Sequence, residues 1–300
     1  IHENTSMHFH GPVAFAELGG GDWASNTGCS TAFYATNTVG KVSPCYSLRM
    51  LTMAPDIFPT APVVSFERAA NPGEYATSGQ INLCGQNQVF DRLSHFTKLQ
   101  AVGKESGVIR SYDPDASSRI LPATVTLRGT ASACTTAKVS DDVSVFWCPT
   151  DAAYMQSFSN RVSTTVGTLA VSNGVLEVSG AASFPNVTRI NVMAGGTFRL
   201  NTTAANALAG VTNLTVEAGG TFEVVSGATP FTDKRARIDL QPGATLRWPT
   251  DDTYTFSGVM YGAWPLDPGT YTNAKLPELK SGTLVTGRIR GYSGLMLLVR

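Results

Sequence analysis

A pair of histidines near the start of the chain is the first candidate for chemistry. His8 and His10 are separated by one residue, so on a β-strand both imidazoles would lie on one face and could bind a metal ion together. No third ligand is evident in the neighbouring sequence. A surface or capping segment near the terminus is the simpler interpretation.

The stretch FDRLSHF brings Asp91, Arg92, Ser94 and His95 close together in sequence. A serine-based triad is not expected here, because no GxSxG turn surrounds Ser94 and sequence neighbours rarely form a triad in space. We interpret Asp91 and Arg92 as outward-facing residues at a chain corner.

Two aspartates in the stretch SYDPDASSR are candidates for calcium binding. Asp113 and Asp115 offer clustered oxygen atoms, which Ca²⁺ prefers. The EF-hand spacing and the GGxGxD repeat are both missing. The sequence Asp-Pro-Asp is also typical of a turn, and we favour a turn over a calcium site at this position. The same holds for Asp251 and Asp252.

Aromatic residues near the C-terminal end are candidates for sugar binding. Tyr261 and Trp264 lie in a glycine-containing turn, where exposed rings could stack on sugars. The alternative is that the aromatics of this region cap the end of the core. Trp248 shares the register of apolar residues upstream and is expected to be buried.

The elements that must position these residues are strands, because one eleven-residue phrase returns three times. It reads INVMAGGTFRL at 190–200, LTVEAGGTFEV at 214–224 and IDLQPGATLRW at 238–248. Ile190, Leu214 and Ile238 are therefore 24 residues apart (214 − 190 and 238 − 214). A fixed period of this size without a helical pattern predicts an all-β parallel β-helix, or β-solenoid, of about 24 residues per coil.

Alternation within each phrase predicts which side chains face the core. Stacking of successive coils would align Leu176, Phe198, Phe222 and Leu246 in one inward row. Glycines between the two short strands of a phrase suit a sharp corner, since glycine tolerates positive φ.

The outward positions of the same strands carry charges of alternating sign. Glu177, Arg199, Glu223 and Arg247 occupy equivalent places in successive coils, and opposite charges on adjacent strands attract. A surface ladder of ion pairs is the preferred interpretation. A glycosidase needs two carboxylates, which Glu177 and Glu223 could supply with Arg199 binding substrate between them.

Composition narrows the class of protein. The net charge is zero and charged residues make up 15% of the chain, which disfavours nucleic-acid binding. No apolar run is long enough for a membrane-spanning helix. The glycine- and threonine-rich composition is typical of a secreted all-β protein, and a chain beginning at Ile1 suggests a mature form or a piece of a longer protein with further domains.

The five cysteines suggest an oxidising compartment. Cys29 with Cys45 and Cys134 with Cys148 would each close a short loop, which leaves Cys84 as a buried thiol. The alternative is five reduced cysteines. No CxxC occurs, so a zinc site is not expected.

Three regions are predicted along the chain. Residues 1–75 are rich in Gly, Asn, Ser and Pro and are expected to form irregular coils or an irregular N-terminal capping segment with short strands. Residues 76–249 contain the solenoid strands. Residues 250–300 are expected to form antiparallel hairpins that close the C-terminal end, because an open solenoid end exposes a sheet edge.

The repeat region resembles a known family. GQINLCGQNQVFDRLSHF at 79–96, GTLAVSNGVLEV at 167–178 and the tail from Pro265 onward are similar to segments of secreted bacterial proteins with autotransporter-associated β-strand repeats. The resemblance covers residues 76–300. It implies a parallel β-helix displayed outside the cell, often beside adhesive or carbohydrate-active modules.

Two functions follow as expectations, and a third, a viral tail-fibre segment, would need a trimerising end that the sequence does not show. The first is a structural or adhesin-like solenoid segment of an extracellular or cell-surface protein, touching glycans through Tyr261 and Trp264 and needing no cofactor. The second is a polysaccharide lyase or glycoside hydrolase built on the same fold. Fold alone does not decide between them.

Overall fold

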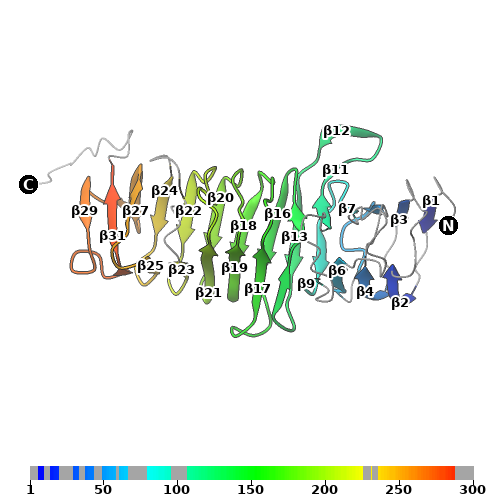
Figure 1. Cartoon of the computed structure of the whole chain (residues 1–300), viewed down its shortest axis with the longest axis horizontal. Coiled ribbons are helices and arrows are strands. Elements are labelled where there is room, and N and C mark those ends of the chain that lie inside the picture. Colours follow the sequence, from blue (N-terminus) through cyan, green and yellow to red (C-terminus); the bar gives the residue numbers. More distant parts are fainter. Residues whose placement is uncertain are drawn as a thin grey trace, which may run out of the picture.

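The computed structural model describes residues 6–9, 14–19, 30–33, 38–43, 49–58, 61–66, 80–95, 107–225, 231 and 236–287. All regular elements in these ranges are β-strands. Successive coils follow one another along the long axis of the molecule, from β1 at one end to β29 at the other (Figure 1). The predicted parallel β-solenoid with about 24 residues per coil is confirmed. No helix in the described residues has the length and apolar character needed to cross a membrane.

The strands lie on three faces of the solenoid, and the coil of β7, β8 and β9 contributes one strand to each face. The first sheet consists of β1 (Ser6–Phe9), β3 (Ser30–Phe33), β5 (Arg49–Thr52), β7 (Gln80–Asn82), β10 (Val108–Arg110) and β15 (Lys138–Val139). The second consists of β8 (Gln88–Phe90), β13 (Ala123–Leu127), β16 (Val143–Trp147), β18 (Thr168–Val171), β20 (Arg189–Val192), β22 (Asn213–Val216), β24 (Arg237–Leu240), β27 (Gly258–Tyr261) and β28 (Trp264–Pro265).

The third face is built in two sections that meet where β9 contacts β14. The first section contains β2 (Ala14–Gly19), β4 (Thr38–Ser43), β6 (Val63–Phe66) and β9 (Leu93–His95). The second contains β14 (Ala133–Thr135), β17 (Met155–Ser159), β19 (Gly174–Gly180), β21 (Gly196–Thr202), β23 (Thr221–Val224), β25 (Thr245–Arg247) and β30 (Leu279–Ser281).

Apolar rows fill the interior, as the alternation of each strand requires. Leu176 pairs with Phe198, Phe198 with Phe222, and Phe222 with Leu246, all in parallel register. The rings of Phe198 and Phe222 are stacked with centroids 5.6 Å apart and planes 4° apart. Trp248 is buried at the end of this row, where its ring lies 6.0 Å from that of Phe222.

The parallel stack extends beyond the predicted bounds of 76–249. In the N-terminal region β1, β3 and β5 pair in parallel, and the stack continues into β7. Past residue 249, β27 continues the second sheet, and β26 (Thr253–Phe256) pairs in parallel with β31 (Thr283–Thr286). The described parts of 1–75 are therefore coils of the solenoid with short strands, which is the first of the two alternatives expected for this region.

Antiparallel pairs occur at the C-terminal end, as expected, and once within the body. β28 pairs with β27, and β29 (Gly269–Tyr271) pairs with β31. Between β10 and β13 the chain forms a hairpin of β11 (Tyr112–Asp113) and β12 (Ala116–Ile120). This hairpin projects from the side of the solenoid (Figure 1).

Candidate functional site

Buried amide side chains join coils near the start of the regular solenoid. The Asn82 Oδ1 atom accepts a hydrogen bond from Tyr112 N at 3.0 Å, and its Nδ2 atom donates to Tyr112 O at 3.1 Å. The Gln88 Oε1 atom accepts from Ile57 N at 3.2 Å, and Nε2 donates to Ala54 O at 2.7 Å. Both amides are fully buried. They therefore satisfy backbone groups that would otherwise lack partners inside the core.

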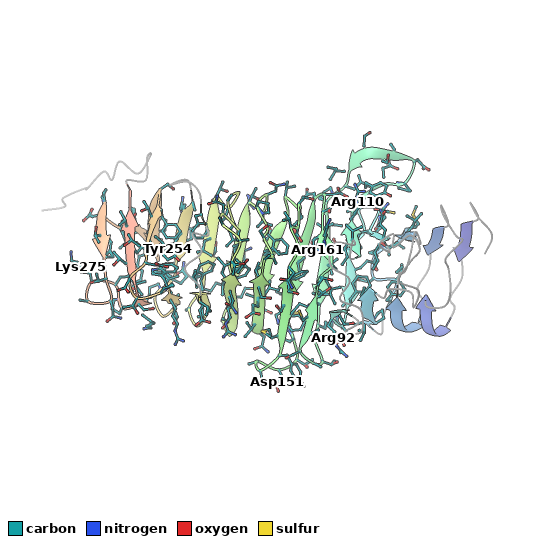
Figure 2. All side chains as sticks on the ribbon, viewed as in Figure 1. Arg92, Arg110, Asp151, Arg161, Tyr254 and Lys275 are labelled. Atoms are coloured by element: carbon teal, nitrogen blue, oxygen red, sulfur yellow. The ribbon has the colours of Figure 1, made fainter. Side chains whose placement is uncertain are left out.

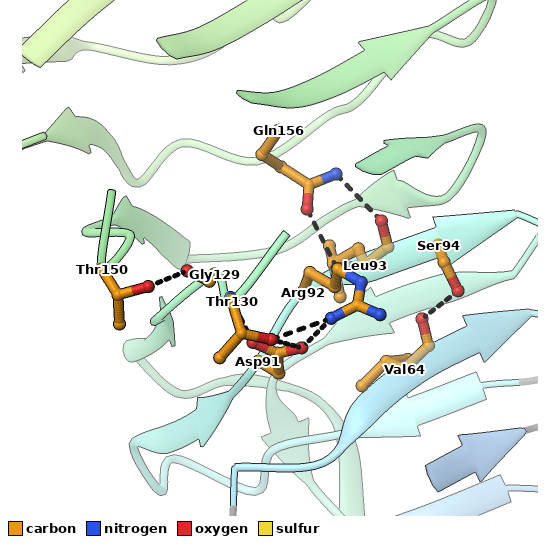
Figure 3. Close-up of polar contacts among 9 residues, drawn as sticks. All are labelled: Val64, Asp91, Arg92, Leu93, Ser94, Gly129, Thr130, Thr150 and Gln156. Carbon is orange, nitrogen blue, oxygen red and sulfur yellow. Dashed lines mark hydrogen bonds and ion pairs between the residues drawn. The ribbon is translucent and has the colours of Figure 1, made fainter. Parts of the chain in front are cut away.

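Gln156 has the same role on the third face. Its Oε1 atom accepts from Leu93 N and its Nε2 atom donates to Leu93 O, both at 3.0 Å (Figure 3). The side-chain amide thus takes the place of a strand backbone beside β9. The structural roles of Asn82, Gln88 and Gln156 were not expected from the sequence. Gln88 and Gln156 each place a polar amide where the strand alternation calls for an apolar side chain, which was a usable signal. Asn82 follows the inward-facing Ile81, so alternation gave no signal for its burial.

The described polar side chains of the FDRLSHF stretch, Asp91, Arg92 and Ser94, form a polar corner. The Asp91 carboxylate accepts from Thr130 N at 2.7 Å and from the Thr130 hydroxyl at 3.1 Å, and it also pairs with Arg92 (Figure 3). The Ser94 hydroxyl donates instead to a backbone carbonyl of β6 at 3.3 Å. Asp91 was expected to face outward but is 6% exposed. Its carboxylate holds the next coil in place. The side chain of His95 lies outside the described residues.

The candidate calcium residues lie in the β11–β12 hairpin. The Asp113 carboxylate accepts from Asp115 N at 3.0 Å and lies 3.4 Å from Arg119 Nη1. These contacts are those of a charged turn. Within the described ranges no group of three or more His, Cys, Asp or Glu residues could hold a metal ion. His10 lies outside these ranges, and only the backbone of His8 is described.

The charged row on the third face forms a chain of ion pairs. Arg199 Nε lies 2.8 Å from Glu223 Oε2, and Arg199 Nη1 lies 3.8 Å from Glu177 Oε2. Arg247 Nη1 lies 3.8 Å from Glu223 Oε1. Glu177 also accepts a hydrogen bond from the Ser157 hydroxyl at 3.1 Å. Both carboxylates of the enzyme hypothesis are thus engaged, with Arg199 bound to each.

Cys84, Cys134 and Cys148 are thiols in the described part of the chain, and the predicted bond between Cys134 and Cys148 is not formed. Cys84 is buried and Cys134 is exposed. Burial raises the pKa of the Cys148 thiol. Cys29 and Cys45 lie outside the described residues, so their pairing stays a prediction.

The predicted sugar-binding aromatics lie together at the C-terminal end. Tyr261 and Trp264 face each other across the β27–β28 hairpin. Trp264 is 77% exposed, whereas Tyr261 packs partly against the core. The Tyr261 hydroxyl donates to Glu278 Oε1 at 3.0 Å. This hydrogen bond and the negative charge of the carboxylate raise the pKa of Tyr261.

Glu278 is the member of this cluster that the sequence did not reveal. Its Oε1 atom also accepts from Gly243 N at 3.1 Å. The residue is 6% exposed, and its Oε2 atom is buried with no hydrogen-bond partner among the described residues. The contacts span 17 and 35 residues of sequence. No local motif could have pointed to them.

Other aromatics of the region belong to the core or to turns. Tyr254 is 5% exposed, its ring lies 5.0 Å from that of Trp248, and its hydroxyl donates to Asp252 at 3.0 Å. Figure 2 shows Tyr254 within the body of the solenoid and Lys275 at its far end. Trp264 is therefore the most exposed large apolar side chain of the described residues.

Comparison of the chain with protein-family models, with curated proteins and with solved structures gives no match.

Proposed function

We propose that this chain is a structural solenoid segment of an extracellular or cell-surface protein, and that it binds glycans without modifying them. The proposal rests on one observation: the polar side chains that could have been catalytic are already bonded to other groups of the protein. The buried amides and Asp91 hold backbone groups, and the outward carboxylates pair with arginines. The exposed indole of Trp264 supports glycan contact, because aromatic faces stack on sugar rings.

The proposed location rests on the resemblance to proteins with autotransporter-associated β-strand repeats and on the low fraction of charged residues, 15%. A solenoid also offers long, regular surfaces, which suits display of binding sites. Further domains of a longer chain would then be held away from the cell.

A carbohydrate-active enzyme is the second candidate, and one observation favours it. Glu177 and Glu223 are separated by two strand spacings, or about 9.6 Å at roughly 4.8 Å per strand. This is close to the separation of about 6.5–9.5 Å found in inverting glycosidases. Against it, Arg199 lies between the two carboxylates and contacts both.

A glycan array combined with a product assay separates the two. The purified chain is screened for binding, and the same polysaccharides are tested for new reducing ends and for unsaturated products. Binding without product supports the proposal. Product that disappears in the Glu177→Gln, Glu223→Gln double variant would establish the enzyme instead, and absence of binding and of product would remove the glycan part of the proposal.

A further inference from the structure

The corner between the second and third faces carries a ladder of glycine backbone groups. Gly195 N donates to Gly219 O at 3.1 Å, and Gly219 N donates to Gly243 O at 3.0 Å. Gly243 N then donates to Glu278 Oε1 at 3.1 Å instead of to another glycine. The aligned N–H dipoles of this corner favour a negative charge at the end they point to. Glu278 is therefore held at that point by the backbone.

The charge of Glu278 is incompletely compensated. No ion pair to it occurs among the described residues, and Oε2 has no hydrogen-bond donor there. A buried acceptor without a donor is uncommon in native proteins and calls for an explanation. The field of this carboxylate acts on Tyr261, whose hydroxyl donates to it. The Tyr261 oxygen thereby becomes a better acceptor for a further donor.

Tyr261, with its hydroxyl bonded to Glu278, and the neighbouring Trp264 are placed so that both could contact a ligand. They are directly opposite in an antiparallel pair, so both side chains project to the same side of the hairpin. The indole is 77% exposed, and Asp267 and Lys275 nearby in sequence are exposed too. One large ring among polar residues is not the extended apolar patch typical of a protein interface. It matches the C–H face of a single sugar ring.

We infer that Trp264, Tyr261 and Glu278 form a subsite for a neutral or amino sugar at the C-terminal end of the solenoid. This deepens the glycan-binding function proposed above and rests on it. The sugar ring stacks on Trp264, and one of its hydroxyl groups donates to the Tyr261 oxygen. Glu278 is a positioning residue that orients the Tyr261 hydroxyl. Its negative charge disfavours uronic acids, because like charges repel.

The test measures dissociation constants of the full chain for the best neutral glycan on the array and for its uronic-acid counterpart. Trp264→Ala is expected to weaken binding of the neutral glycan by roughly tenfold or more, as removal of an anchoring aromatic does. Tyr261→Phe is expected to weaken it by several-fold. Ile120→Ala, at another exposed apolar residue on the β11–β12 hairpin, is the control and should bind like wild type.

Glu278→Gln tests the positioning role. The amide oxygen still accepts from Gly243 and Tyr261, but the charge is gone. The ratio of neutral to uronic binding should therefore fall, which a purely structural residue would not cause. Thermal unfolding checks that the variant is folded. If Glu278→Gln is not folded, Trp264→Ala still tests whether the subsite exists, because replacing an exposed side chain is not expected to unfold the chain.

Each result has one meaning. Wild-type binding that Trp264→Ala and Tyr261→Phe leave unchanged overturns this subsite, while the proposed function stands. An unchanged neutral-to-uronic ratio in folded Glu278→Gln overturns the role of its charge. Absence of any glycan binding by the wild-type chain overturns both the subsite and the glycan part of the proposed function.

Discussion

Replacement of Phe222 by alanine is expected to be among the most damaging single changes in the repeat region. Phe222 is 0% exposed, is stacked on Phe198 and lies 6.0 Å from the ring of Trp248. Loss of a buried phenylalanine costs about 3–5 kcal/mol, because the transfer free energy is lost and a cavity remains. With aromatic neighbours in two adjacent coils, we expect the upper part of that range. The control is Val225→Ala, at a residue that is 51% exposed and should change stability by less than about 0.5 kcal/mol.

The assay is urea unfolding followed by circular dichroism and by tryptophan fluorescence, with amide hydrogen exchange on the folded variant. Solenoid coils are stabilised by their immediate neighbours, so protection should fall most in β21, β23 and β25 and least in β13 and β16. A free energy of unfolding within about 1 kcal/mol of wild type would refute the stacked-ring account. Equal loss of protection in all coils would refute the claim that each coil is stabilised mainly by its immediate neighbours.

Three further predictions concern the corner, the charged row and high pH. Gly174→Ala should destabilise more than Gly219→Ala by at least about 1 kcal/mol, because both glycines have positive φ but only at Gly174 would the new Cβ lie 2.4 Å from a backbone oxygen; equal unfolding midpoints would contradict this. Arg199→Met should cost about 1–2 kcal/mol, since two partly buried carboxylates lose their shared cation; a loss that persists undiminished in 1 M NaCl would argue against an electrostatic cause. Burial, followed by the hydrogen bond to Asp252 and the charge of that carboxylate, raises the pKa of Tyr254 well above 10.0. The neutral phenol therefore contributes fully to folding stability below the unfolded pKa, and this contribution is lost as pH rises toward the folded pKa. Between pH 9 and 11 the urea midpoint should fall less steeply for Tyr254→Phe than for wild type, and identical slopes would contradict the assignment.

The repeat region could be predicted from sequence because its pattern is local. The 24-residue spacing of Ile190, Leu214 and Ile238 is the observed strand register. Each coil there has the same length, so equivalent residues recur at equal intervals. Apolar alternation then assigns the inward rows.

The N-terminal coils could not be predicted in this way because their lengths differ. Paired residues of β1, β3, β5 and β7 are 24, 19 and 31 residues apart (30 − 6, 49 − 30 and 80 − 49). Short strands joined by loops of unequal length leave no visible period. Contacts such as Glu278 with Tyr261 depend on where separate loops meet, which no spacing rule specifies.

The most direct test of the account is the mass profile of a polysaccharide panel after prolonged incubation with the purified chain, together with the amount of chain retained on each polysaccharide. The account predicts retention on at least one neutral or amino-sugar polymer and an unchanged distribution of chain lengths. Shortened or unsaturated products would contradict it and would turn attention to Glu177, Arg199 and Glu223 as an active site.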